Sequence, residues 1–316
     1  MTGPSIGKVV VIVVGPTAAG KSALGIALAH RLGGEIVNCD STAVYRGIDI
    51  GTDKVAPADQ QGVPHHLIDI VEPTATYSAA DFARDASRVV REIHARGHVP
   101  ILVGGTGFYV RALTRGLFDG PSRDDVLRGR LDRVAARRGP ECLHRALSRV
   151  DPASGQRIQS RDQKRLVRAL EVYLKTGRPL TDHFAETHSP LADFTFVMLG
   201  VRIPTALTAE RVRRRVDQQF SRGVVDEVRD LLATGVPATA HALSGLVYRQ
   251  VLELLRGERD ETATRELIVR ENMHYARRQL IWFRKEPSLV WLDGPGERPE
   301  ALVAAEAIVR RHGVSC

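Results

Sequence analysis

Residues 15–22 constrain the fold more than any other stretch of the sequence. They follow the phosphate-loop pattern GxxxxGK[ST] and are Gly15, Pro16, Thr17, Ala18, Ala19, Gly20, Lys21 and Ser22. An apolar, β-branched run at 8–14 precedes them and a helix-like run at 23–29 follows, which places the loop between a predicted strand and a predicted helix. There the backbone N–H groups and the helix N-terminus face an anion, with Lys21 adding charge and Ser22 placed to meet magnesium. The pattern therefore predicts a site for a pyrophosphate-like group.

Strand-like and helix-like runs alternate along most of the chain. Apolar runs that predict further strands lie at 35–39, 66–70, 99–103, 194–201 and 289–292. Helical patterns lie at about 77–95, 206–221, 224–233, 246–256, 260–284 and 298–312. This alternation predicts an α/β fold, a P-loop NTPase-like parallel sheet flanked by helices. Ligands of such sheets bind at the carboxyl ends of the strands, so Asp40, Thr106 and the phosphate loop should converge on one crevice.

The middle of the chain has a different character. Helical patterns fill residues 118–192 without an obvious strand, and arginines are concentrated at 123–138. We therefore expect an all-helical insertion at 118–192 within a catalytic core formed by residues 1–117 and 193–316. Most of these arginines would lie on solvated helix faces, but their density across several helices favours a nucleic-acid partner.

Composition narrows the class of protein. Lys plus Arg outnumber Asp plus Glu by 45 to 37, and this net charge of +8 fits a polyanionic partner. No apolar run approaches the ~20 residues of a membrane span, and residues 1–7 lack the features of a signal peptide, so we expect a cytoplasmic protein with no membrane segment. The scattered Cys39, Cys142 and Cys316 argue against a disulfide framework and against structural zinc.

Residue patterns alone leave the chemistry open. A phosphate loop commonly works with a second acid near magnesium, and either Asp40 or Asp69 could fill that role. The reaction could be phosphoryl transfer, with ATP bound as the motif suggests, or one in which pyrophosphate leaves. Adjacent residues on a strand point to opposite faces, so His65 and His66 are a poor metal pair and we interpret them as structural.

Several further motifs carry a resemblance to a known family. They are Asp40-Ser41 with the run 44–52, then the runs 64–69, 77–82, 102–109, 165–172, 276–279 and 282–284. Together with the phosphate loop they extend from about 9 to 285, most of the chain. In this pattern the sequence resembles the tRNA dimethylallyltransferase family, and the joint match is far more specific than the phosphate loop alone.

This resemblance implies prenyl transfer. A dimethylallyl group would pass from dimethylallyl diphosphate to the N6 amine of the adenine immediately 3′ of the tRNA anticodon. The phosphate loop would hold the leaving diphosphate with Mg2+, and Asp40 would orient the amine and accept its proton. Thr106 would contact the substrate, and Arg211 would lie near the diphosphate or the tRNA. We assign catalytic roles to Asp40, Thr106 and Arg211.

The same resemblance implies which residues would touch tRNA. After the base has left its stack, Asp40 would line the acceptor nucleotide together with Ser41, Thr42, Ala43 and Thr106. In the insertion, phosphate contacts would clamp the anticodon stem. The implied residues there are Arg128, Lys164, Arg165, Leu166, Val167 and Arg168. We assign Trp282 and Phe283 to the core rather than to base stacking.

A few positions depart from the family pattern. Ala43 stands where Gln is common, so base recognition there would be lost or supplied by the backbone. Val247 stands where Gly is usual, which argues against a close backbone approach to RNA. Asn272, His274 and Ile281 replace Thr, Gln and Thr, and they leave the role of the last long helix open.

Two other classes of function fit parts of the sequence. A nucleotide kinase, or a prenyltransferase acting on free AMP, would use the phosphate loop but needs no arginine-rich arm. A non-catalytic RNA-binding protein would use the insertion but needs neither Lys21 nor Asp40. We expect a monomeric enzyme that modifies tRNA.

Overall fold

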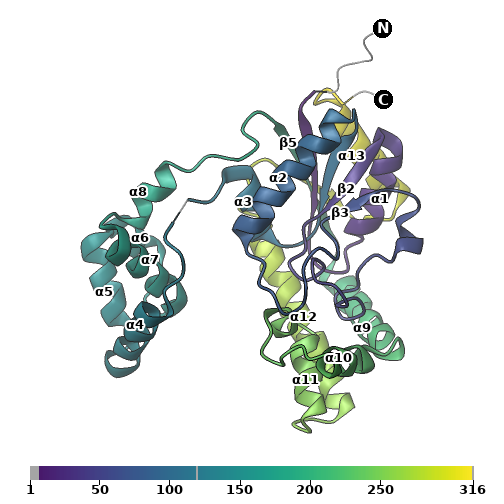
Figure 1. The fold of residues 1–316 in the computed structure, drawn as a ribbon. Helices are drawn as coiled ribbons and strands as arrows, with labels where there is room; N and C mark the ends of the chain where they lie inside the picture. Colours follow the sequence, from purple (N-terminus) through teal and green to yellow (C-terminus); the bar gives the residue numbers. More distant parts are fainter. Residues whose placement is uncertain (1–6, 119, 315–316) are drawn as a thin grey trace. The chain divides into compact units, whose positions relative to one another are not determined.

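Six strands, all paired in parallel, form one sheet in the order β3-β2-β4-β1-β5-β6. The structure is a computed structural model and describes residues 7–118 and 120–314 (Figure 1). The strands are β1 (Val9–Val14), β2 (Gly34–Asn38), β3 (His65–His66), β4 (Val99–Val103), β5 (Thr195–Arg202) and β6 (Leu289–Asp293). The predicted α/β class, a parallel sheet flanked by helices, is confirmed.

Strand β1 lies inside the sheet because both of its faces are apolar. Its alternate residues Val9, Val11 and Val13 pack into one hydrophobic core. Val10, Ile12 and Val14 pack into a second core on the other face. A strand buried on both faces needs helices on each side of the sheet. The carboxyl end of β1 therefore delivers the phosphate loop to the middle of the sheet edge, between β4 and β5.

Two groups of helices cover the two faces of the sheet (Figure 1). Helices α1 (Lys21–Leu32) and α13 (Pro299–Arg310) pack on one core, and α2 (Ala79–Ala95) and α3 (Gly107–Arg115) pack on the other. The second core also includes residues of α9 (Thr205–Ser221), α10 (Val224–Ala233), α11 (Tyr248–Leu255) and α12 (Glu261–Phe283). Short 3-10 turns occur at Pro57–Gln60 and His241–Ser244. Among the described residues, no helix is both long enough and apolar enough to cross a membrane.

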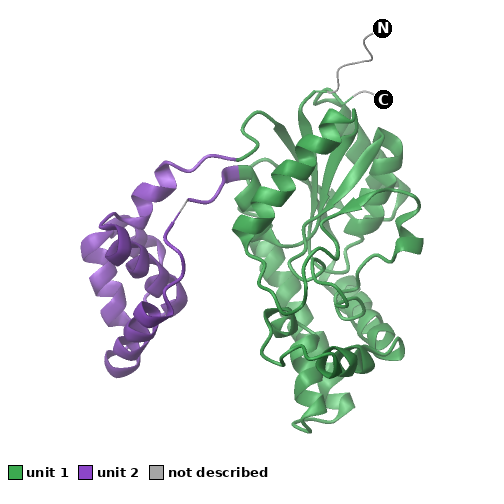
Figure 2. Ribbon diagram, viewed as in Figure 1, with its two compact units in different colours: residues 1–114, 190–316 green, residues 115–189 purple. Residues whose placement is uncertain are grey.

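Residues 115–189 form a second compact unit, distinct from the unit of residues 1–114 and 190–316 (Figure 2). Its helices are α4 (Asp125–Arg138), α5 (Glu141–Val150), α6 (Pro152–Arg157), α7 (Gln163–Thr176) and α8 (Leu180–Ala185). Apolar residues of these helices, among them Leu147 and Leu166, form a core that belongs to this unit alone. Its described residues contain no strand, and its limits lie close to the 118–192 expected for an all-helical insertion.

Local chemistry explains where two of the elements begin and end. Helix α2 begins with the expected capping box, because Asp81 N–H donates to Ser78 Oγ (3.2 Å) and Ser78 N–H donates to the Asp81 carboxylate (3.0 Å). The strand predicted at 66–70 is wrong beyond His66. Leu67 and Asp69 have φ values of 61° and 54°, which lie outside the extended region that a strand requires.

Candidate active site

The phosphate loop leaves β1 and enters α1 through a tight turn. The backbone φ is 148° at Gly15, 62° at Ala18 and 89° at Gly20. A side chain at Gly15 would collide with the carbonyl oxygen of Val201, so this position requires glycine on steric grounds as well. Gly20 is the N-cap of α1 and offers no side chain to the first N–H groups of the helix. Those groups are therefore left for an anion.

Lys21 lies beside this turn, and no carboxylate of the described residues is in hydrogen-bond contact with it. Its ammonium donates to the carbonyl oxygen of Pro16 at 2.7 Å. Desolvation, followed by repulsion from Arg215, lowers the pKa of Lys21 to about 8, against the attraction of Asp40. A desolvated cation with so little compensation is unfavourable until a negative group arrives. The loop is therefore arranged to receive an anionic ligand.

Two arginines of α9, one helical turn apart, contact the phosphate loop differently. Arg215 donates to Thr17 Oγ1 at 2.7 Å, pairs with Asp53 at 2.5 Å and lines the cavity beside Lys21. Arg211 was the arginine singled out in the sequence. It donates to the Ala18 carbonyl at 3.3 Å and pairs with Glu297, outside the residues that line the cavity. Arg211 thus braces the loop, while Arg215 faces the space where a ligand would lie.

Asp40 follows β2 directly and is held through one carboxylate oxygen. Its Oδ1 accepts hydrogen bonds from the Thr42 N–H (2.8 Å) and the Thr42 hydroxyl (2.6 Å). Within the described part of the chain, Oδ2 accepts no hydrogen bond from a protein donor. A carboxylate fixed at one oxygen and available at the other can orient a donor and accept its proton.

Thr106 follows β4 and supports the Asp40 segment. Its Oγ1 accepts a hydrogen bond from the Ser41 N–H at 3.1 Å, and its own N–H donates to the Cys39 carbonyl at 3.2 Å. Burial, and then the negative charge of Asp40, raise the pKa of Tyr275 on α12, against a hydrogen bond that it makes with Thr106. The Tyr275 phenol therefore stays protonated at neutral pH beside Asp40.

One cavity of about 120 Å³ has the phosphate loop and the Asp40 segment in the same wall. Its lining includes Lys21, Ser22, Asp40, Ala43 and Arg215. The structure also brings in two α12 residues that sequence reasoning did not single out as site residues, Tyr275 and Gln279. Gln279 ends the run 276–279 that carries the resemblance, and its spacing of four residues from Tyr275 places both on one helix face.

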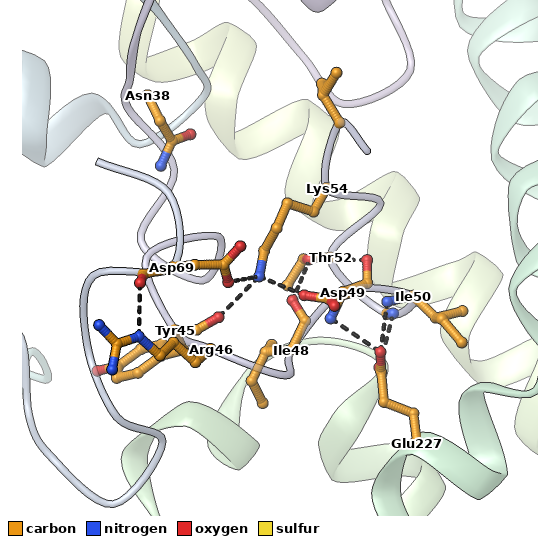
Figure 3. Close-up of polar contacts among 12 residues, drawn as sticks. Asn38, Tyr45, Arg46, Ile48, Asp49, Ile50, Thr52, Lys54, Asp69 and Glu227 are labelled. Carbon is orange, nitrogen blue, oxygen red and sulfur yellow. Dashed lines mark hydrogen bonds and ion pairs between the residues drawn. The ribbon is translucent and has the colours of Figure 1, made fainter. Parts of the chain in front are cut away.

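The nearly buried side chain of Lys54 links three residues of the segment that follows Asp40 (Figure 3). The Lys54 side chain is 6% exposed, and its ammonium donates to the Asp49 and Asp69 carboxylates, both at 2.5 Å, and to the Tyr45 carbonyl at 2.8 Å. Glu227 of α10 accepts from the backbone N–H of Ile50 at 2.7 Å. Asp69 lines a neighbouring cavity of about 730 Å³ rather than the phosphate-loop cavity. Of the two acids considered from the sequence, only Asp40 shares a cavity with Lys21.

The oxygen donors of the phosphate-loop cavity suit magnesium. Ser22 and Asp40 both line it and offer hydroxyl and carboxylate oxygens, the hard ligands that Mg2+ prefers. Among the described residues, no three His, Cys, Asp or Glu side chains gather into a metal site made by protein alone. Mg2+ commonly uses one or two carboxylates together with substrate phosphates, and this donor set permits that mode. His65 and His66 do not act together, since their ring nitrogens contact the Val63 carbonyl and Glu35 respectively.

The basic residues of the second unit differ in burial. The fully buried Glu171 side chain accepts hydrogen bonds from Arg128, at 2.9 and 2.8 Å, and from Arg168 at 2.6 Å. Lys164 and Arg165 are exposed on α7. Leu166 and Val167 are 0% and 4% exposed and belong to the core of the unit. Buried side chains cannot contact RNA, so these two do not belong to an RNA-binding surface.

Comparisons with known proteins identify the relatives of the chain. A family model described as IPP transferase matches residues 43–286. A tRNA dimethylallyltransferase of Geobacter metallireducens is 47% identical, over 91% of this chain and 93% of that protein. The crystal structure of the full-length tRNA isopentenylpyrophosphate transferase of Bacillus halodurans matches with a TM-score of 0.72 at 34% identity, over 96% of each chain. A eukaryotic dimethylallyltransferase, studied as crystallographic snapshots of its action on tRNA, matches with a TM-score of 0.78 at 26% identity, over 96% of this chain and 79% of that one.

Proposed function

This chain belongs to the IPP transferase family, and we propose that it transfers a dimethylallyl group from dimethylallyl diphosphate to the N6 amine of the adenine immediately 3′ of the anticodon in tRNA, releasing diphosphate. One observation carries the proposal: the anion-binding loop and Asp40 line the same cavity. The donor of such a transfer needs a site for its diphosphate, and the acceptor amine needs a base beside it. Residues suited to both tasks line this one cavity.

The residues of the phosphate loop act on the leaving group. Lys21 and the backbone N–H groups at the start of α1 bind the diphosphate and stabilise the negative charge that develops as the carbon–oxygen bond breaks. Arg215 adds a second positive charge in the same wall. Mg2+, held by Ser22 together with the phosphates, would neutralise further charge on the diphosphate.

Asp40 and its neighbours act on the acceptor. An adenine amine is a weak nucleophile and loses a proton as its nitrogen bonds to the allylic carbon, and the Asp40 carboxylate orients the amine and takes that proton. Ser41, Thr42 and Ala43 line the acceptor nucleotide, with Thr106 supporting them from the neighbouring loop. The base must leave its stack to reach this cavity.

The second unit supplies the contacts to the anticodon stem. Lys164 and Arg165 are exposed, as are Arg130, Arg133 and Arg137 of α4. Phosphate contacts from such residues position an RNA without reading its sequence. We propose that the enzyme acts as a monomer on tRNA in the cytoplasm.

A transfer assay tests the function directly. Purified protein is mixed with labelled dimethylallyl diphosphate, Mg2+ and either tRNA or AMP, and the product is mapped to its nucleotide. We expect label on the adenine next to the anticodon. Label in AMP but not in tRNA would instead indicate an enzyme of free nucleotides, and label in neither would indicate a binding protein.

The Asp40→Asn variant tests the proposed base. The amide keeps the shape of the side chain but cannot accept the proton as a carboxylate does, so turnover should fall by about 10²-fold or more. The affinity of this variant for tRNA, measured by filter binding, should be unchanged. Normal turnover in this variant would remove Asp40 from the mechanism.

A further inference from the structure

Helix α12 contacts three consecutive residues of the loop that follows β4, each through a different side chain. Gln279 Nε2 donates to the Gly105 carbonyl at 3.0 Å, and the Tyr275 phenol lies beside Thr106. The Trp282 ring lies so close to Gly107 that any side chain there would collide with it. The three α12 side chains lie on one face of the helix, at spacings of four and three residues. One helix face thus fixes the whole 105–107 loop.

Gln279 is distinguished from the other two because its carboxamide holds two loops at once. The residue is 6% exposed. Its Oε1 accepts a hydrogen bond from the Thr17 N–H at 2.8 Å, while its Nε2 donates to the Gly105 carbonyl. Thr17 belongs to the phosphate loop and Gly105 to the loop after β4. A planar amide bonded at both ends sets the distance between these two backbones.

The bridge continues from Gly105 to the catalytic acid. The next residue, Thr106, accepts the Ser41 N–H through its hydroxyl, and Ser41 is the neighbour of Asp40. A side chain at Gly105 would collide with Gln279 Nε2, so the loop and the amide are fitted closely to each other. Gln279 therefore lies between the loop that binds an anion and the segment that carries the Asp40 carboxylate.

We propose that Gln279 is a positioning residue that sets the separation between the diphosphate loop and the Asp40 segment. The inference rests on the proposed function, because in that reaction the two reacting atoms belong to ligands held by these two loops. The amine nitrogen bonds to the allylic carbon, the carbon–oxygen bond breaks with its electron pair leaving on diphosphate, and the proton passes to Asp40. Misplacing reacting atoms by about 1 Å costs on the order of 10²-fold in rate.

Two substitutions separate the two hydrogen bonds of the amide. Gln279→Met removes both at similar volume and should lower kcat by about 10²-fold, with KM for either substrate changed less than about threefold. Gln279→Glu keeps an acceptor for the Thr17 N–H but sets a carboxylate oxygen against the Gly105 carbonyl oxygen, and this repulsion should lower kcat at least as far as in Gln279→Met. A merely structural role would instead lower the amount of folded enzyme and leave kcat per folded molecule unchanged.

Gln219 of α9 provides the matched control. It is also buried, at 2% exposure, and its Nε2 also donates to a glycine carbonyl, that of Gly51, at 3.0 Å. Gln219 lies outside the residues that line the phosphate-loop cavity. Gln219→Met should keep kcat within about twofold of the unchanged protein. Equal loss of kcat in the two Met variants would overturn the proposal.

Hydrogen exchange measures the bridge without any reaction. The Thr17, Ser41 and Thr106 amides should exchange at least about tenfold faster in Gln279→Met and at unchanged rates in Gln219→Met. Unchanged rates at these amides in Gln279→Met would overturn the proposal. If the unsubstituted protein failed to transfer the label to tRNA, the proposed function would fall, while the exchange rates would still decide whether Gln279 joins the two loops.

Discussion

The phosphate loop and the second unit each desolvate a charged side chain, and they compensate that charge in opposite ways. In the loop, Lys21 hydrogen-bonds to the Pro16 carbonyl, and desolvation with repulsion from Arg215 lowers its pKa to about 8. In the second unit, burial alone would raise the pKa of Glu171, but hydrogen bonds from Arg128 and Arg168 lower it to about 2. The difference teaches that a compensated charge holds a fold together, while an uncompensated one is kept for a ligand.

Replacing Lys21 should have the largest effect and should separate activity from stability. Lys21→Met removes a cation aimed at the leaving diphosphate, so kcat/KM for transfer should fall by about 10²–10³-fold. The substitution also removes a desolvated charge, so the free energy of unfolding at pH 7 should stay equal or rise. Turnover and urea unfolding measure the two quantities. A large loss of stability would show that Lys21 is compensated in the way that Glu171 is.

Replacing Glu171 should give the converse result. Glu171→Gln leaves two arginines without their shared carboxylate, and the second unit should lose about 2–4 kcal/mol of stability, somewhat less than a fully buried pair because both arginines are partly exposed. Hydrogen exchange in residues 115–189 measures this loss. Binding of inorganic diphosphate should be unchanged. The matched control is Glu186→Gln, which breaks the exposed pair with Arg178 and should change exchange very little.

The affinity for diphosphate should depend on pH through Lys21. Because its folded pKa is about 8, Lys21 is mostly charged at pH 7, half charged near pH 8 and increasingly neutral above it. The contribution of Lys21 to the affinity for inorganic diphosphate should therefore be nearly constant below about pH 7 and fall by up to about tenfold per pH unit above about pH 8. Calorimetry from pH 6.5 to 9.5 measures the slope. Lys21→Met should remove it, and a slope that persists in this variant would assign the titration to another group.

Local sequence signals were enough for the fold and for part of the site. The glycines of the phosphate loop, the alternating apolar residues of β1 and the Ser78–Asp81 capping box each act within a few residues, so the sequence displays them directly. Helix α10 was expected at 224–233 and occupies those residues. Strand β3 was overestimated because Leu67 and Asp69 adopt positive φ values, and contacts distant in sequence engage both residues: Asn38 donates to the Leu67 carbonyl and Lys54 pairs with Asp69.

Long-range pairings were what the sequence could not reveal. Arg211 and Arg215 lie one turn apart on the same face of α9, and only the packing decides which of them faces the cavity. Glu171 lies in a motif rich in arginine, yet its burial between Arg128 and Arg168 depends on how α4 meets α7. Val247 adopts φ 74°, a conformation that favours glycine, which accounts physically for the glycine usual at this position.

The strand order has a consequence for how the chain is made. Strand β1 pairs with residues 101–103 of β4 and with residues 195–200 of β5, and the second unit lies between them in sequence. At roughly 5–20 residues per second, a ribosome needs about 4–15 s to synthesise residues 115–189. Throughout that interval one edge of the apolar β1 has no partner, and unpaired edges of this kind promote aggregation. Because residues 115–189 are synthesised before β5, the inserted helices can form their own core before the sheet is complete.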